Sequence, residues 1–379
     1  RTKTTITVVG TFADGKVTAG ISSAAMRTLI DKAASEGGVS GRDTIEIAVS
    51  VPAGATGVSL AVPGAEFAAL ADDTDANLMI SSPFATIAFD GQALDAIAGA
   101  ATGDDVVISA DLADVQGLSE EDFAKVEGRP VYDFTVTAGG TVVSDFGGGK
   151  ATISVPYTLR PGEDPDAIMV WYVDDTGQLT AADGRYDPAT GTVVITTGHF
   201  SQYVIGHNPV IFSDVADDAW YKKAVTFIAA REITNGGGEG LYGPDLTLTR
   251  GHVVVFLMRA FGIEPDTESS DNFSDAGDTW YTGYLGAAKR LGISNGIGDN
   301  LYGPELGMKR QDLFTMMYRT LDLLSELPDV DAGAKLTNFS DEAEVQNYAR
   351  EATSELVKRG VVNGSDGRIE PMGISTRAQ

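Results

Sequence analysis

The spacing of hydrophobic residues changes near residue 207 of this 379-residue chain. Before that point, β-branched and aromatic residues alternate with polar ones in short runs that end at Gly, Asp or Pro, as is typical of β-strands. These runs are TKTTITVVG, DTIEIAVSV, DVVISADL, VYDFTVTA, KATISVPYTL, AIMVWYVDD and TGTVVITT. After residue 210 the apolar spacing follows the 3.6-residue period of amphipathic helices. The first half is therefore predicted to be β-rich and the second half helical.

Two segments with helical spacing interrupt the strands, at residues 23–36 and at about 91–98. Between Leu112 and Pro130 the sequence GLSEEDFAKVEGRP lacks strand character, and we place a domain boundary there. We predict a multidomain α+β chain. Its two small, sandwich-like β domains cover residues 1–118 and 119–207, and an all-α domain covers residues 208–379.

The helical half repeats one pattern three times, from Phe212, Phe273 and Phe339, each of which opens Phe-Ser-Asp. A first helix follows, with Trp220 on its apolar stripe in the first repeat and Trp280 in the second. The Ser-Asp pair supplies side-chain oxygens that can cap a helix N-terminus. Because a unit of this size cannot bury its apolar face alone, the repeats are expected to pack on one another.

Each first helix ends at an Asn-Gly pair, whose residues tolerate the left-handed backbone of a tight turn. A Gly/Pro-rich loop then leads to a second helix, which begins at an arginine in every repeat. In the first repeat Thr249 is the expected N-cap and Gly262 the expected end of that helix.

The third repeat stops at Gln379, where its second helix should begin. We expect the natural protein to continue beyond this residue. Without that helix, the face carried by Ala349, Ala352 and Leu356 is expected to stay partly exposed.

These residues resemble the S-layer homology repeat of bacterial surface proteins, over repeats at about 210–264, 271–325 and an incomplete 337–379. The second repeat departs from the family's Thr-Arg-Ala-Glu and reads Met-Lys-Arg-Gln at residues 308–311. The resemblance implies a three-lobed pseudo-trimer of helices. Its inter-repeat grooves would bind the secondary polysaccharide of a bacterial cell wall, which is often pyruvylated and therefore anionic.

The resemblance and the local chemistry nominate one set of polysaccharide-binding residues. A guanidinium beside helix N-terminal N–H groups can hold a carboxylate, an indole can face a sugar ring, and glycine loops allow close approach of the backbone. The candidates are Asp214, Trp220, Asn235, Gly236, Arg250, Asp275, Trp280, Asn295, Gly296, Arg310, Asp341, Asn363, Gly364 and Arg377. Purely structural roles stay open, with the tryptophans in the core, the aspartates as caps and the arginines in ion pairs.

In the β-rich half, ISVPY, WYVDDTGQ, RYDPATGTV and HFSQYVIG resemble a region found before these repeats in clostridial-type surface proteins. That resemblance implies spacer or lattice modules and carries no chemistry that can be transferred.

The formal net charge of −27 argues against nucleic acid and against an anionic membrane surface as partners. An anionic wall polymer meets the same repulsion, but screening limits it to about 8–10 Å at physiological salt, so an arginine groove can prevail locally. No segment reaches the length of a membrane span, and the absence of cysteine excludes disulfides and thiolate metal sites.

Several sequence patterns that are typical of catalytic or metal-binding sites are incomplete in this chain. The three histidines, His199, His207 and His252, come without a Gly-x-Ser-x-Gly elbow. GGGEG at residues 236–240 follows a helix and lacks the Gly-Lys-Ser/Thr ending of a phosphate loop. Asp73, Asp75 and Asn77 resemble the start of a calcium-binding loop, but the Gly and Glu that such a loop requires at later positions are missing. We therefore predict no catalytic residue, no cofactor and no metal.

The sequence favours a secreted, non-enzymatic protein of the cell wall or S-layer that displays its β domains outward. Two alternatives stay open. The chain can be a subunit that assembles with copies of itself into a surface layer or filament, using TKTTITVVG for strand exchange. It can also be the anchor part of an exported enzyme.

Overall fold

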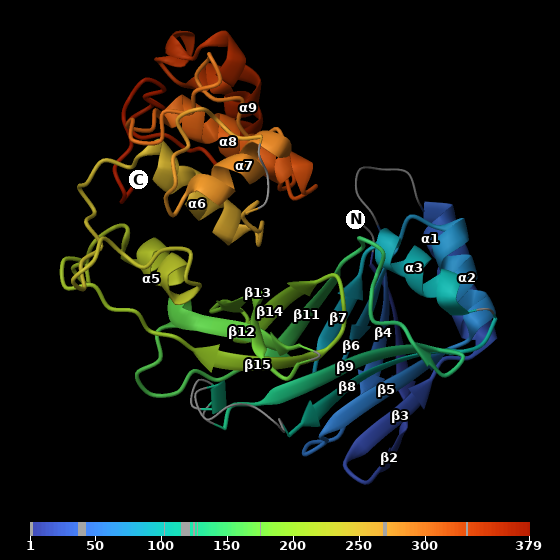
Figure 1. The fold of residues 1–379 in the computed structure, drawn as a ribbon. Helices are drawn as coiled ribbons and strands as arrows, with labels where there is room; N and C mark the ends of the chain where they lie inside the picture. The colour runs from blue at the N-terminus through green and yellow to red at the C-terminus, as the bar shows by residue number, and fades with distance from the viewer. Residues whose placement is uncertain are drawn as a thin grey trace. The chain divides into compact units, whose positions relative to one another are not determined.

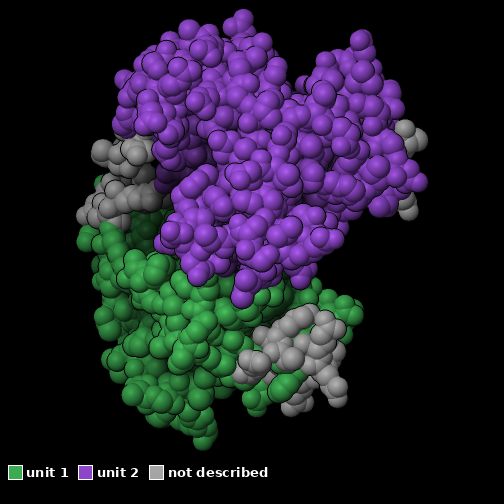
Figure 2. Space-filling view, turned by 90° about the vertical axis from the view of Figure 1, so that its left-hand side faces the viewer, with its two compact units in different colours: residues 1–209 green, residues 210–379 purple. Residues whose placement is uncertain are grey.

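The computed structural model of the chain describes residues 3–36, 43–101, 103–114, 122–123, 126, 128–174, 176–267, 271–330 and 333–379. The chain forms two compact units, residues 1–209 and 210–379, which are coloured separately in Figure 2. The boundary expected between residues 118 and 119 lies outside the described residues.

The strands of unit 1 form a single sheet (Figure 1). They are β1 (Lys3–Val9), β2 (Thr11–Ala13), β3 (Lys16–Gly20), β4 (Thr44–Ser50), β5 (Gly57–Val62), β6 (Asn77–Ser81), β7 (Thr86–Phe89), β8 (Val106–Ala113), β9 (Val131–Ala138), β10 (Thr141–Val142), β11 (Ala151–Pro156), β12 (Ile168–Val173), β13 (Leu179–Asp187), β14 (Thr192–Thr197) and β15 (Gln202–His207). Their order in the sheet is β1-β4-β6-β7-β11-β14-β13-β12-β15-β9-β8-β5-β3-β2, with β10 beside β9.

The expectation of two small sandwich domains is wrong, because strands from both expected domains pair with each other. β8 is antiparallel to β9 from Val106↔Ala138 to Ala113↔Val131, and β7 pairs with β11. The pattern along each strand predicts which residues face the core, but it does not say which strand lies next to it. The polar stretch between β8 and β9 therefore looked like a linker between domains, although the two strands it joins are neighbours in one sheet.

Two corners bend this sheet until it nearly closes into a barrel. In β13 the first half pairs with β12 and the second half with β14, and a Cβ at Gly184 would lie 2.4 Å from a methyl of Val170. At the other corner Gly10 separates β1, which pairs with β4, from β2, which pairs with β3. A Cβ at Gly10 would lie 2.5 Å from the carbonyl oxygen of Thr18, so glycine permits the close approach.

The large hydrophobic core of unit 1 draws residues from both sides of the expected domain boundary. Phe200 lies 5.6 Å from Phe89, 5.8 Å from Phe134 and 5.0 Å from Phe146 between ring centroids. Phe89 comes before the expected boundary and the other three come after it, so the aromatic cluster joins both halves.

The helices α1 (Ser23–Glu36), α2 (Gly64–Asp73) and α3 (Gly91–Ala101) lie side by side at the end of unit 1 that holds β4 and β6 (Figure 1). The predictions for α1 and α3 are confirmed. Sequence analysis missed α2, although Phe67 and Leu70 have helical spacing and are fully buried.

The helices of unit 2 are α5 (Lys222–Ala230), α6 (Arg250–Ala260), α7 (Thr282–Arg290), α8 (Arg310–Leu323) and α9 (Asn347–Lys358), with short 3-10 turns at Leu336–Asn338 and Glu342–Glu344. Thr249 caps α6 by accepting a hydrogen bond from the His252 backbone N–H, and Gly262 follows with φ of 61°, as predicted. Trp220 and Trp280 precede α5 and α7, so they do not lie on a helix stripe.

The expected description of this part as all-α is also wrong, because isolated β-bridges link its loops to one another. They pair Thr247 with Thr376, Thr249 with Gly307, and Lys309 with Ile374. Each bridge joins backbone just before one second helix to the corresponding backbone of another repeat. Helical periodicity does not report pairing between loops, and the sequence therefore gave no sign of it.

The face of α9 that was expected to be exposed is buried. Ala349, Ala352 and Leu356 are at most 3% exposed, and Ala349 and Leu356 belong to a core that includes Phe314 and Leu321 of α8. The preceding repeat thus covers the face that we had assigned to a missing helix.

A buried ion pair ties two loops of unit 1 together. Arg129 and Glu163 have side chains only 6% and 4% exposed, and Arg129 Nη2 lies 2.9 Å from Glu163 Oε1. The hydroxyl of Tyr157 and the backbone N–H of Arg160 also donate to this carboxylate. Burial opposes ionisation, but these donors hold the pKa of Glu163 below its usual value.

We predict that Glu163→Gln lowers the unfolding free energy of unit 1 by about 3 kcal/mol, because it removes the buried carboxylate charge that pairs with Arg129 and accepts from Tyr157 and Arg160. Asp111→Asn is the matched control, since it breaks a Lys16–Asp111 pair whose side chains are 57% and 27% exposed, and about 1 kcal/mol or less is expected. Urea unfolding can be followed by Trp171 fluorescence in a W220F/W280F background. Equal losses in the two variants would contradict the prediction.

Candidate functional site

The aspartate of each Phe-Ser-Asp motif holds the loop that follows its own helix. Its two carboxylate oxygens accept hydrogen bonds from two consecutive backbone N–H groups. These are Tyr242 and Gly243 for Asp214, at 2.7 Å each; Tyr302 and Gly303 for Asp275, at 2.8 Å each; and Ile369 and Glu370 for Asp341, at 3.1 and 2.8 Å. Burial opposes ionisation, but the N–H donors hold the pKa of Asp214 and of Asp341 below its usual range.

The repeated arginine, which begins α6 and α8 and recurs as Arg377, holds the loop of the next repeat. Arg250 Nε donates to the Tyr302 carbonyl at 2.8 Å, Arg310 Nε to the Ile369 carbonyl at 2.8 Å, and Arg377 Nε to the Tyr242 carbonyl at 2.9 Å. The contacts therefore run from the first repeat to the second, from the second to the third, and from the third back to the first. Arg250 and Arg377 are 5% and 8% exposed, whereas Arg310 is only partly buried.

The Asn-Gly pairs turn the chain from the first helix into these loops. Gly236, Gly296 and Gly364 have φ of 79°, 74° and 62°. A Cβ at Gly296 would lie 2.2 Å from the Leu301 carbonyl oxygen, and the other two glycines meet the same obstacle. The preceding residues, Asn235, Asn295 and Asn363, are exposed.

Both candidate tryptophans are on the surface, since Trp220 is 76% and Trp280 is 53% exposed. Each lies fifteen residues before the asparagine of its Asn-Gly pair. The same spacing in the third repeat leads to Tyr348, which is also 53% exposed. Sequence analysis missed Tyr348, although counting back from Asn363 would have found it.

A first groove, which we call the Arg250 groove, combines residues of all three repeats in about 420 Å³. Arg250 comes from the first repeat, Asn295 and Gly296 from the second, and Tyr348 from the third. One face of α8 completes it with Asp312, Thr315, Met316 and Arg319, together with Lys309 just before the helix.

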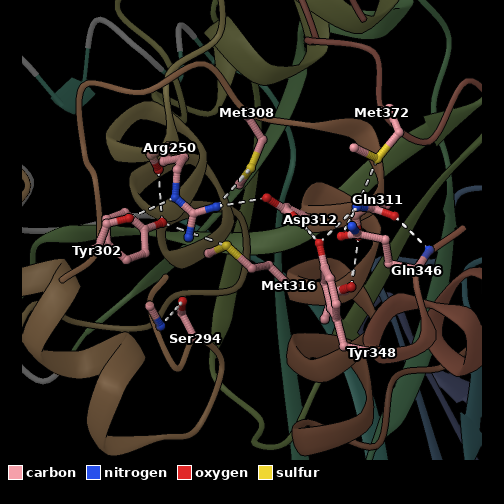
Figure 3. A network of polar contacts seen from close by, with 12 residues as sticks. Arg250, Ser294, Tyr302, Met308, Gln311, Asp312, Met316, Gln346, Tyr348 and Met372 are labelled. Atoms are coloured by element: carbon pink, nitrogen blue, oxygen red, sulfur yellow. Dashed lines mark hydrogen bonds and ion pairs between the residues drawn. The ribbon is translucent and has the colours of Figure 1, made fainter. Parts of the chain in front are cut away.

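Figure 3 shows the polar network in the Arg250 groove. Asp312 Oδ2 lies 3.0 Å from Arg250 Nη1, and Asp312 Oδ1 accepts a short hydrogen bond from the Tyr348 hydroxyl. Gln311 Nε2 also donates to Tyr348, at 3.0 Å, and to Gln346 Oε1, at 2.9 Å. The aromatic ring is thereby fixed at the rim of the groove.

A second groove, the Arg310 groove, has a volume of about 530 Å³. It contains the same three features, an arginine, an Asn-Gly pair and an aromatic residue, but each comes from the repeat that follows the one supplying it in the Arg250 groove. Arg310 comes from the second repeat, Asn363 and Gly364 from the third, and Trp220 from the first. The other lining residues are Val361, Ser365, Arg368, Ile369, Glu370 and Gln379.

The remaining candidates, Arg377, Asn235 and Trp280, lie near one another around α6. Arg377 Nη2 donates to Thr234 Oγ1 at 3.3 Å, next to Asn235 in the sequence. The guanidinium also lies 5.6 Å from the ring centre of Phe256, and Trp280 packs on His252 at 5.1 Å. Burial lowers the pKa of His252. Arginine, Asn-Gly and aromatic residue again come from three different repeats.

Comparison with known proteins identifies the first two repeats. Residues 211–254 and 272–314 match the S-layer homology domain. The chain is 24% identical over 168 residues to an S-layer protein of Bacillus anthracis, and 31% identical over 115 residues to a cell surface protein of Thermoanaerobacter kivui. These alignments cover 44% and 29% of this chain, and 20% and 15% of the two relatives.

An alignment to an amylopullulanase of Thermoanaerobacterium thermosulfurigenes is longer, with 29% identity over 301 residues. It covers 74% of this chain but 16% of that protein. The chain thus spans at most a fifth of the length of these relatives.

The chain therefore carries S-layer homology repeats and is of the bacterial surface-protein type that such repeats define. It is a secreted protein that is associated with the cell wall and the cell surface. Among the described residues, no helix is long and apolar enough to cross a membrane, and no cluster of His, Asp and Glu has the arrangement of a metal site.

We predict that Gly296→Ala destabilises unit 2 by roughly 1–3 kcal/mol more than Gly292→Ala does. Both glycines have φ near 70°, but a Cβ at Gly292 meets no atom within 4 Å. The difference therefore isolates the clash with Leu301 from the cost of the left-handed backbone, which both variants share. Thermal unfolding of the two variants measures it, and equal melting temperatures would contradict the close packing at Gly296.

Proposed function

We propose that unit 2 anchors the protein non-covalently to an anionic, pyruvylated secondary polysaccharide of the cell wall, and that the inter-repeat grooves are the binding sites. The observation that carries this proposal is the repeated combination of an exposed aromatic ring, an Asn-Gly turn and an arginine in each groove. Aromatic rings can stack on sugar rings, and guanidinium groups pair with carboxylates.

The charges in the grooves support an anionic ligand. Arg250, Lys309 and Arg319 outnumber Asp312 in the Arg250 groove. Arg310 and Arg368 outnumber Glu370 in the Arg310 groove. Both grooves are therefore locally positive in a chain whose formal net charge is −27. Because exposed charges beyond about 8–10 Å are screened at physiological salt, these local charges decide the interaction.

We further propose that unit 1 is a non-enzymatic module that stands between the anchor and whatever the full protein displays. An alignment of 301 residues with the amylopullulanase is longer than the 170 residues of unit 2, so it extends into unit 1. A β unit whose sequence is similar to part of a protein named as an enzyme fits a spacer. The same observation favours, as a second candidate, that this chain is the anchor portion of an exported enzyme.

A third candidate, assembly with copies of itself, is favoured by the position of β1. This strand stands at one end of the strand order, β4 is the only strand among the described residues with which it pairs, and alternate residues along it are exposed. An unpaired strand edge can accept a strand from another molecule. Regular oligomers of the purified chain that disappear on Thr5→Pro would favour this candidate, since proline removes a backbone donor.

We predict that the full chain sediments with wall sacculi that retain their secondary polysaccharide and stays in solution with sacculi chemically stripped of it. Trp220→Ala should weaken binding at least about tenfold, because stacking and apolar contact with the sugar are lost. Phe12→Ala is the matched control, since Phe12 is an aromatic residue of β2 in unit 1 that is 50% exposed. Equal binding to intact and stripped sacculi would contradict the proposed function.

A further inference from the structure

Each Asn-Gly pair of unit 2 carries the two groups that react with each other in spontaneous deamidation. The sequence contains three such pairs, at residues 235–236, 295–296 and 363–364, and all three asparagines are exposed. The backbone nitrogen of the residue after an asparagine can attack the amide carbon of that side chain. Glycine leaves this nitrogen most accessible, because it has no Cβ. By residue type alone, the three pairs should therefore react alike.

The first two repeats hold the glycine nitrogen with a hydroxyl group. The N–H of Gly236 donates to Thr234 Oγ1 at 3.2 Å. The N–H of Gly296 donates to Ser294 Oγ at the same distance (Figure 3). Both hydroxyls belong to buried side chains, which are 2% and 4% exposed, so breaking either bond is costly. Because the N–H must leave its hydroxyl before the nitrogen attacks, this bond protects the two pairs.

The third repeat lacks that protection. Val362 stands where the other repeats have Thr234 and Ser294, and its side chain carries no oxygen. Among the residues that the structure describes, none accepts a hydrogen bond from the N–H of Gly364. The nitrogen of Gly364 therefore needs to break no hydrogen bond within the protein before it attacks Asn363.

One contact restrains the side chain of Asn363. Its Nδ2 donates to the Gly360 carbonyl at 2.9 Å, at an exposed position. Water can replace either partner there, so this bond hinders the reaction less than a bond to a buried hydroxyl does. It also engages the nitrogen that leaves, and neither of the two atoms that form the new bond. The N–H of the glycine thus decides the order of reactivity.

We propose that Asn363 is a deamidation site of this protein and that it reacts faster than Asn235 and Asn295. The nitrogen of Gly364 loses its proton and bonds to Cγ of Asn363, while the Cγ–Nδ2 bond breaks and Nδ2 leaves as ammonia with that proton. The cyclic succinimide then takes up water from the solvent. Opening at Cγ gives aspartate, and opening at the backbone carbonyl gives isoaspartate, which inserts the Cβ methylene into the main chain.

The products alter both the third loop and the Arg310 groove. An isoaspartate lengthens the backbone at a tight turn, where Gly364 has φ of 62° and a Cβ would lie 2.3 Å from the Arg368 carbonyl oxygen. Either product adds a carboxylate to a groove in which Arg310 and Arg368 stand against Glu370, so the positive excess there disappears. An aged chain should therefore hold an anionic wall polymer less tightly, a consequence that rests on the proposed function.

The test incubates the full chain at mildly alkaline pH and follows each Asn-Gly pair by peptide mapping and mass spectrometry. Asn363 should react about fivefold faster than Asn235 and Asn295, which is the rate equivalent of one ordinary hydrogen bond. In urea, where no loop is folded, the three pairs should react at similar rates. Equal rates in the folded chain, or a preference for Asn363 that persists in urea, would overturn the proposal.

Two reciprocal variants test the role of the hydroxyl. Val362→Thr nearly keeps the shape of the side chain and adds the missing acceptor, so it should slow Asn363 about fivefold. Ser294→Ala removes the acceptor of the second repeat and should speed Asn295 by a similar factor, with Asn235 as the unchanged internal control. An unchanged rate at Asn295 would overturn the proposal even where Val362→Thr does not fold.

Sedimentation with intact sacculi separates this inference from the proposed function. Fresh native chain reports on the proposed function alone. Aged native chain should sediment less than fresh chain, whereas Val362→Thr aged for the same time should sediment as fresh chain does. Undiminished sedimentation of a chain that is deamidated at Asn363 would overturn the expected loss of anchoring.

Discussion

The hydrogen bonding of three loop backbones is the constraint on which unit 2 depends. Each loop presents two N–H groups to the aspartate of its own repeat and one carbonyl to the arginine of another repeat. A loop carries no regular ladder of its own, so buried polar groups in it need side-chain partners. The aspartate and the arginine together satisfy that need and thereby fix the three repeats against one another.

This role explains why the candidate residues divide into two groups. The aspartates and the Nε atoms of the arginines are engaged by backbone and are not free to bind a ligand. The exposed aromatic rings, the exposed asparagines and the remaining guanidinium nitrogens surround the open space of the grooves. The family resemblance indicated the loop-holding residues and the groove-lining residues as one set of candidates. A residue type that recurs in every repeat does not reveal whether it supports a binding site or contacts the ligand.

The sequence predicted the local features of both units well and their long-range pairing poorly. Alternation identified strands such as β4 and β9, and the cap at Thr249 marked the start of α6. Neither signal says which strands are neighbours, and so one nearly closed sheet looked like two domains. The corners at Gly10 and Gly184 were equally hidden, since a glycine in a strand does not reveal what it approaches.

The composition of each groove follows from the cyclic order of the loops. Because arginine, Asn-Gly turn and aromatic residue come from three different repeats, no single repeat contains a complete groove. Asp312, two positions after Arg310, contacts the side chains of Arg250 and Tyr348 in the Arg250 groove. A change there can alter the charge of one groove while the aspartates and the arginine Nε atoms keep the loops in place. The three repeats can thus share one framework and still present chemically different surfaces to a polymer.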